Sequence, residues 1–270
     1  MTKRLVDLWG ALILWLTSLV GIVAFAYPFL LQQVPRDALT HRSENALAAL
    51  AVLVTLCLIA VLVELTSGRM NARTVATMGV LLAINAALRL VETTLIALPG
   101  GFSPVFFLIT LSGYVFGARF GFLYGALSLL VSAMITGGVG PWLPYQMLTA
   151  GWVGLTAGWF HPLASRTRWE VPILAVFGLL WGFLYGAILN LYFWPYLVGA
   201  TGGGWEPGLG LSEVIRRYAA FYVVTSLGWD GLRAVGNFLL MVVLGAPVLK
   251  ILRRFRQRFQ VEFEEISPHG

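Results

Sequence analysis

The chain has 270 residues, of which 59% are hydrophobic and 11% charged, and its mean hydropathy is +0.83. Soluble domains carry about 25% charged residues, so most of this chain must face lipid or other membrane helices. At about 20 apolar residues per helical span, roughly eight spans fit, and no soluble catalytic domain. The single cysteine, Cys57, excludes a disulfide framework and a multi-cysteine metal site. We therefore predict an all-α, polytopic membrane helix bundle that holds no cofactor or metal.

The first two predicted spans form an N-terminal segment, residues 1–73. The first span, Trp9–Leu31, follows Lys3 and Arg4, as the apolar region of a signal peptide would. It is longer than such a region and lacks a small-residue cleavage site, which predicts a retained span. The second span is about Ala46–Leu65.

Six further spans are predicted within residues 74–254, before a cytoplasmic tail at 255–270. They are about Thr74–Leu98, Phe102–Phe116, Phe122–Thr136, Leu143–Phe160, Val171–Trp194 and Trp229–Leu252. The segment Glu213–Leu227 is apolar but too short to cross a bilayer. We interpret it as an interfacial or re-entrant helix, broken from the last span by Gly228 and Gly231.

The basic residues predict the orientation of the spans. With the N-terminus in the cytoplasm, four basic residues lie outside, and Arg89 and Arg233 lie within spans. The other 12 of the 18 lie inside: Lys3, Arg4, Arg69, Arg73, Arg119, Arg166, Arg168, Lys250, Arg253, Arg254, Arg256 and Arg258. This asymmetry places both termini in the cytoplasm of an inner-membrane protein. It also accounts for the net charge of +6 without nucleic-acid binding.

Polar side chains recur in the outer halves of several predicted spans. A charge at the bilayer centre costs about 2.5–3.5 kcal/mol on insertion scales, so such residues usually face a bundle interior or a wet cavity. Their shared depth predicts a solute pocket open to the outside. Its main candidates are Asn190, Asp230, Arg233 and Asn237, followed by Tyr145, Gln146, Arg89 and Glu92, with Trp142 at the rim. The competing interpretation is that these residues form ion pairs and hydrogen bonds that only hold the helices together.

Small residues form two stripes at four-residue spacing. Gly79, Ala83 and Ala87 make one face of the third span nearly flat, and such faces let helices approach closely in lipid. The second stripe consists of Gly113, Gly117, Gly121 and Gly125. Spacing alone leaves open whether either stripe faces inward or toward another subunit.

Three stretches between Thr74 and Arg254 form a recognisable set. They are an Ala-rich helix with Ala83-xxx-Ala87 ended by Pro99–Pro104, the segment Gly113–Gly121, and the segment Gly137–Met147. Together they resemble the substrate-binding S components of energy-coupling factor (ECF) vitamin transporters. The two leading spans and the long Glu213–Leu227 helix depart from that family's pattern.

The resemblance implies a six-span binding protein that sits on a transmembrane scaffold subunit driven by two ATPase subunits. It implies that Ala83 and Ala87 match the scaffold-contacting Ala-xxx-Ala of the family. It also implies a small-molecule vitamin substrate, with cobalamin as the leading candidate.

Three functions remain open from the sequence. A solute-capturing transporter subunit needs ATPase partners, because the chain has no Gly-x-x-x-x-Gly-Lys-Ser/Thr phosphate loop. A stand-alone proton-coupled carrier would use Asp230 as a proton relay, but the internal repeat that favours such carriers is not evident. An intramembrane enzyme is not expected, because neither His-Glu-x-x-His nor Gly-x-Ser-x-Gly occurs.

Overall fold

The computed structural model describes residues 3–30, 51–57, 59–60, 63, 72–95, 103–165, 167–196 and 204–259. All regular structure in these ranges is helical, which confirms the predicted all-α bundle. The elements are α1 (Lys3–Leu30), α3 (Ala72–Leu90), the π-helical turn η1 (Val91–Leu95), α4 (Val105–Phe116), α5 (Ala118–Thr136), α6 (Leu143–Ala164), α7 (Glu170–Phe193), the 3₁₀ turn η2 (Trp194–Tyr196), α8 (Leu211–Thr225) and α9 (Leu227–Phe259).

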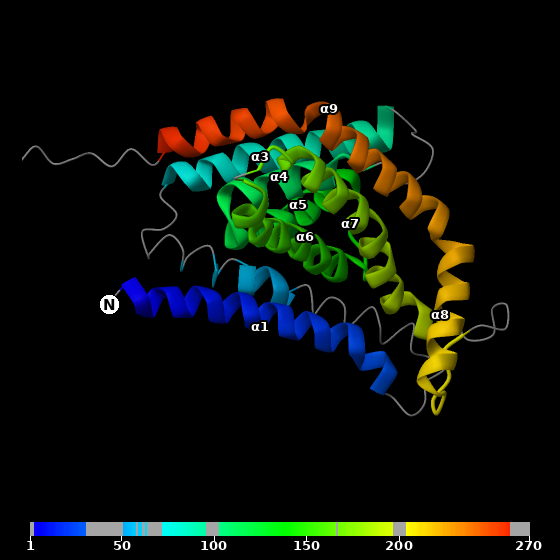
Figure 1. Ribbon diagram of the computed structural model, residues 1–270. Helices are drawn as coiled ribbons and strands as arrows, with labels where there is room; N and C mark the ends of the chain where they lie inside the picture. The colour runs from blue at the N-terminus through cyan, green and yellow to red at the C-terminus, as the bar shows by residue number, and fades with distance from the viewer. Residues whose placement is uncertain are drawn as a thin grey trace, which may run out of the picture.

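Five of the described helices, α1, α3, α5, α7 and α9, are long and apolar enough to cross a membrane, and α4 is a shorter apolar helix. In Figure 1 the helices α4, α5 and α6 occupy the middle of the bundle, with α3 and α9 on one side and α1 on the other. The predicted second span, about Ala46–Leu65, lies largely outside the described residues, as does most of the predicted tail.

The centre of the bundle is held together by backbone contact between helices. A Cβ atom added at Gly113 or Gly121 would overlap the carbonyl of Gly154 on α6, and one added at Gly125 would overlap that of Ala150. The stripe that contains these glycines therefore faces inward. Without a hydrophobic driving force in lipid, such close approach is a main source of helix association.

The turn between α4 and α5 is a single residue, Gly117, whereas the sequence predicted a longer turn ending at Gly121. Gly117 has a φ of 100°, a conformation that side-chain-bearing residues rarely adopt. The chain therefore reverses at one residue, and α5 begins at Ala118 rather than at Phe122.

Helices α7 and α9 pack through a second glycine row that the sequence analysis did not single out. A Cβ added at Gly182 would overlap the backbone of Ala234, and one added at Gly186 would overlap the carboxylate of Asp230. The small face of α7 thus brings the polar face of α9 into the bundle.

A polar network joins α4, α7 and α9 at one end of the bundle. The hydroxyl of Tyr114 donates to Glu170 Oε1 at 2.5 Å, and Arg253 forms an ion pair with the same carboxylate. Arg256 Nη1 donates to the carbonyl of Val115 at 2.7 Å. We call this end, with the α4–α5 and α6–α7 turns, the basic end.

The elbow between α8 and α9 lies at Ser226, not at Gly228 and Gly231, which both fall inside α9. The Ser226 hydroxyl accepts a 2.6 Å hydrogen bond from Asn190 Nδ2 on α7, which fixes the elbow in place. The hydroxyl of Tyr222 donates to the Phe183 carbonyl at 3.3 Å and ties α8 to α7. None of the residues of α8 is buried: Ile215, Val223 and Val224 are exposed, whereas Tyr218 packs against Trp194 of η2.

Candidate functional site

A cavity of about 330 Å³ lies at the end of the bundle opposite the basic end. Its wall combines charged, polar and aromatic side chains from α3, η1, α4, α6, α7 and α9. The lining residues are Arg89, Glu92, Ser103, Val105, Phe106, Leu129, Gln146, Tyr185, Leu189, Trp229 and Arg233. Among the described residues, no group of three His, Cys, Asp or Glu side chains could hold a metal ion.

One side of the cavity is built from the end of α3 and the turn that follows it. Arg89 Nη1 donates to Glu92 Oε1 at 2.7 Å and to the Ser103 hydroxyl at 3.4 Å. The Ser103 hydroxyl in turn donates to Glu92 Oε2 at 3.1 Å. Glu92 lies in the π-helical turn η1, a local geometry that is frequent at functional sites. Both oxygens of Glu92 are therefore occupied by partners inside the protein.

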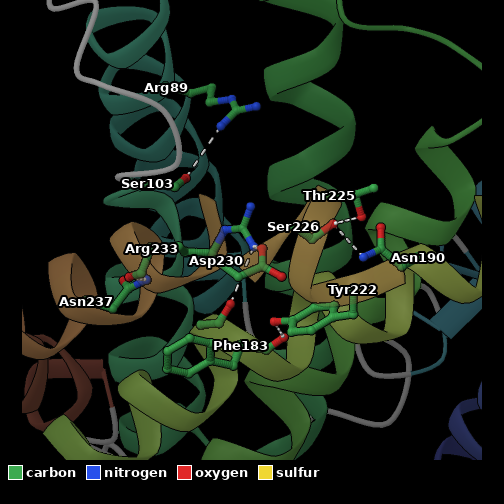
Figure 2. Close-up of polar contacts among 11 residues, drawn as sticks. Arg89, Ser103, Phe183, Asn190, Tyr222, Thr225, Ser226, Asp230, Arg233 and Asn237 are labelled. Atoms are coloured by element: carbon green, nitrogen blue, oxygen red, sulfur yellow. Dashed lines mark hydrogen bonds and ion pairs between the residues drawn. The ribbon is translucent and has the colours of Figure 1, made fainter. Parts of the chain in front are cut away.

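The other side carries the ion pair of α9. Arg233 Nη1 contacts Asp230 Oδ1 and lies 3.4 Å from the Gly182 carbonyl. Its guanidinium also lies over two rings, 5.2 Å from the centroid of Tyr185 and 5.8 Å from that of Phe106. Asp230 is only 2% exposed, so it supports Arg233 from behind the wall. Figure 2 shows this pair, with Arg89 on α3 and Ser103 just before the start of α4.

Four of the nine solute-site residues that the sequence predicted line this cavity: Arg89, Glu92, Gln146 and Arg233. They come from three chain segments that are far apart in sequence. A fifth, Asp230, lies outside the lining but holds Arg233 through the ion pair. The structure thus brings together most of the charged residues of the prediction.

The two asparagines lie elsewhere. Asn190 follows Leu189 on α7 and points to the side, where its amide bonds Ser226 at the elbow. Asn237 lies one turn deeper than Arg233 on α9, and its Nδ2 donates to the Arg233 carbonyl at 2.9 Å. These positions share a helix with the cavity residues, but differ from them in direction or in depth.

The two aromatic candidates also lie away from the lining. The ring of Tyr145 packs between Phe25 of α1, at 4.9 Å, and Tyr192 of α7, at 4.1 Å. Trp142 is 44% exposed, and its indole nitrogen donates to the Gly138 carbonyl at 3.2 Å. Gln146 faces the cavity although its neighbour Tyr145 does not, because successive residues of a helix point about 100° apart.

Sequence reasoning missed most of the uncharged part of the wall. Tyr185 and Leu189 are one turn apart on α7, and Phe106 and Trp229 open α4 and α9. In a chain this apolar, an aromatic or aliphatic residue inside a span carries no signal of its own. Only Ser103, which follows the Pro-Gly-Gly break, stood in a motif that had been singled out.

A model of the ECF transporter substrate-specific component family matches residues 73–245. A search of curated proteins and a search of solved structures each found no match. The matched segment begins with α3 and contains every residue that lines the cavity, while α1 precedes it. It covers more than half of the chain. The chain is therefore a multi-pass membrane protein, and it belongs to the family of ECF transporter substrate-specific components.

Proposed function

We propose that this chain captures a vitamin-like small molecule in the cavity at the end of the bundle opposite the basic end. The observation that carries the proposal is the convergence of charged side chains from α3, η1 and α9 on one hollow, within the segment that the family model matches. Ionised groups in a membrane bundle are costly unless paired, and they usually mark a solute or ion path.

The size of the cavity bears on which solute it takes. At about 330 Å³, it lies at the lower end of the range of pockets that hold drug-sized molecules, about 300–1,000 Å³. Cobalamin, the leading candidate from the sequence resemblance, is a corrin ring with an attached nucleotide and is several times larger than such molecules. The volume therefore favours a smaller, vitamin-like solute over cobalamin.

The capture site is tested by filling the cavity. Leu189→Trp adds an indole to a lining position of α7, and we expect it to abolish solute binding by the purified protein. Leu184→Trp is the matched control, because Leu184 lies on the same helix, is 45% exposed and is not among the lining residues. Mass spectrometry of the small molecules released on denaturation reads out both variants. Equal loss, or equal retention, in the two variants contradicts the assignment of the cavity.

We further propose that the Gly79-Ala83-Ala87 face of α3 docks on a membrane scaffold subunit that is driven by two ATPase subunits. All three residues are exposed, and a Cβ added at Gly79 would meet no described atom within 4 Å. Val80 and Ile84 on the same side of α3 are also exposed. A flat, exposed helix face permits close and reversible contact with another membrane helix.

The docking face is tested with Ala83→Leu/Ala87→Leu, which adds bulk where the backbones would approach. The isolated variant should bind solute normally, since these side chains lie outside the cavity. ATP-driven uptake and copurification of the scaffold should fall sharply. Ala219→Leu/Ala220→Leu, on an exposed part of α8, provides the control. Loss of solute binding in the isolated α3 variant would indicate inward packing and contradict the docking role.

We propose finally that the chain lies in the cytoplasmic membrane, with both termini in the cytoplasm and the cavity open to the outside. The basic-residue asymmetry of the sequence supports this orientation. The gathering of Arg253 and Arg256 at the end opposite the cavity agrees with it.

A further inference from the structure

We propose that the cavity selects solutes that carry an oxyanion, a carboxylate or a phosphate, next to an aromatic ring, and that Arg89 and Arg233 hold the oxyanion. This inference rests on the proposed function of the cavity as the capture site. It follows from which hydrogen-bonding groups of the wall are already used and which remain.

The carboxylates of the wall already have partners inside the protein. Glu92 Oε1 accepts from Arg89 and Oε2 accepts from Ser103, so the charge of Glu92 is already balanced by a cation of the wall. The Asp230 side chain is 3% exposed, with Oδ1 on Arg233. Its Oδ2 has no hydrogen-bond partner among the described residues, but it is buried against Gly186 on α7, away from the cavity lining. A positively charged solute would find no carboxylate in the lining that lacks a cationic partner.

The donors, in contrast, are only partly used. Arg89 makes its hydrogen bonds to Glu92 and Ser103 through Nη1 alone, among the described residues. Arg233 makes its contacts to Asp230 and Gly182 through Nη1, and its buried Nε has no hydrogen-bond partner in the described part of the chain. Figure 2 shows Arg89 extending from α3, and the Arg233 guanidinium rising from α9 on the side where Arg89 lies. A guanidinium with free donors is a strong match for a carboxylate or phosphate.

The positions of the charges around the cavity also favour an anionic solute. The lining contains two guanidinium groups and one carboxylate, because Asp230 lies behind it. With Asp230 included the four charges sum to zero, but an anion in the cavity lies closer to the two guanidinium groups than to Asp230, so these positions favour an anion over a cation. A neutral solute would leave the free donors of Arg89 and Arg233 unpaired on desolvation, which is costly.

The ring preference comes from the aromatic part of the wall. The Arg233 guanidinium lies over the rings of Phe106 and Tyr185, which meet edge to face with their centroids 4.4 Å apart. Trp229 also lines the cavity, yet it is 57% exposed at the start of α9. Its exposed indole, in the same lining as the two arginines, is suited to stacking on a planar solute.

The test uses matched pairs of small molecules that differ in the oxyanion. The probes with an aromatic ring are nicotinate and nicotinamide, and pyridoxal phosphate and pyridoxal. Biotin and biotinamide, and pantothenate and panthenol, have no aromatic ring and test the oxyanion alone. All are titrated calorimetrically into the purified full-length chain. In any pair that binds, we expect the anionic member to bind at least about tenfold more tightly. A neutral member that binds as tightly overturns the inference while leaving solute capture intact.

Where no probe binds, the molecule released from the protein on denaturation decides the question by mass spectrometry. A released molecule with a carboxylate or phosphate supports the inference, and one without either overturns it. A chain that binds no probe and releases no molecule contradicts the capture function itself. Comparison of the carboxylate probes with the phosphate probe shows which of the two oxyanions the cavity binds.

Two charge-neutral double variants assign the role to the arginines: Arg89→Gln/Glu92→Gln and Asp230→Asn/Arg233→Gln. Each removes a whole ion pair, so neither leaves an unpaired buried carboxylate. We expect the preference for the anionic member, measured as the ratio of its affinity to that of the neutral member, to fall at least about tenfold. An unchanged preference in the folded variants overturns the assignment.

The single substitution Arg89→Lys keeps the positive charge but removes the planar pair of donors. It tests the role of Arg89 in oxyanion binding if the double variants do not fold. It should weaken binding of the anionic member more than binding of the neutral member. Arg216→Gln on α8 is the control, because Arg216 is 77% exposed and lies outside the cavity.

Discussion

The packing of Gly186 against Asp230 makes a sharp prediction for the substitution Gly186→Ala. The new Cβ would overlap the Asp230 carboxylate, well inside the 3.0 Å that real Cβ contacts essentially never cross. The carboxylate must therefore shift, and it is held by Arg233 and almost fully buried. The substitution should move Arg233 and deform the cavity wall.

The expected cost follows from two limits. Overfilling a close contact typically costs about 1–3 kcal/mol. Complete loss of a buried ion pair's partner would cost about 3–5 kcal/mol. Because the pair can move together, we expect Gly186→Ala to lower the free energy of unfolding by about 1–3 kcal/mol and to weaken solute binding.

Gly178→Ala is the matched control, two turns away on the same face of α7. Its Cβ would lie 3.6 Å from Asn237 Cβ, an ordinary contact. Denaturant titration in detergent micelles and solute titration should show Gly178→Ala near the parent protein and Gly186→Ala impaired in both. Equal effects of the two substitutions would refute the contact between Gly186 and the ion pair.

Three further predictions follow from other parts of the structure. Gly154→Ala, whose Cβ would overlap the Gly121 carbonyl, should destabilise the protein by about 1–3 kcal/mol, whereas Gly79→Ala should stay within about 0.5 kcal/mol in the same denaturant titration. With Cys57 replaced by alanine, a cysteine at Glu206 should react with an impermeant thiol reagent in intact cells, and one at Arg254 should not; the reverse pattern contradicts the proposed orientation. Hydrogen bonds from Arg216 and Arg217 lower the pKa of Glu213 to about 2, so the stability that these contacts contribute should be fully present above the usual pKa of a glutamate and be lost as the pH falls toward about 2. The protection of α8 amides against hydrogen exchange, relative to their intrinsic rates, should then fall as the pH is lowered toward that value, and Glu213→Gln should remove that response.

The helices of the bundle could be predicted because each is specified by a local sequence pattern. Long apolar runs and turn residues gave the helices, with ends shifted by a few residues where tertiary contacts decide, as at Ser226 and Gly117. The stripes at four-residue spacing were recognised, but not their direction. The stripe through Gly121 faces α6 and that through Ala83 is exposed, which only the packing of the other helices determines.

The candidate site was predictable as far as charge marks it. Arg89 and Arg233 stood out because a charged residue inside an apolar span is costly and usually functional. Both line the cavity. Asn190 stood out equally, but its rotation about α7 directs it to Ser226. Tyr185 gave no signal, since its role depends on the ring meeting Arg233 from another helix.

The most direct test of the account is a structure of the purified chain with its solute bound. We expect density for a small molecule in the cavity, within hydrogen-bonding distance of Arg89 and Arg233 and against the ring of Trp229. Solute density at another place on the protein, with this cavity unchanged and unoccupied, would contradict the assignment of the capture site.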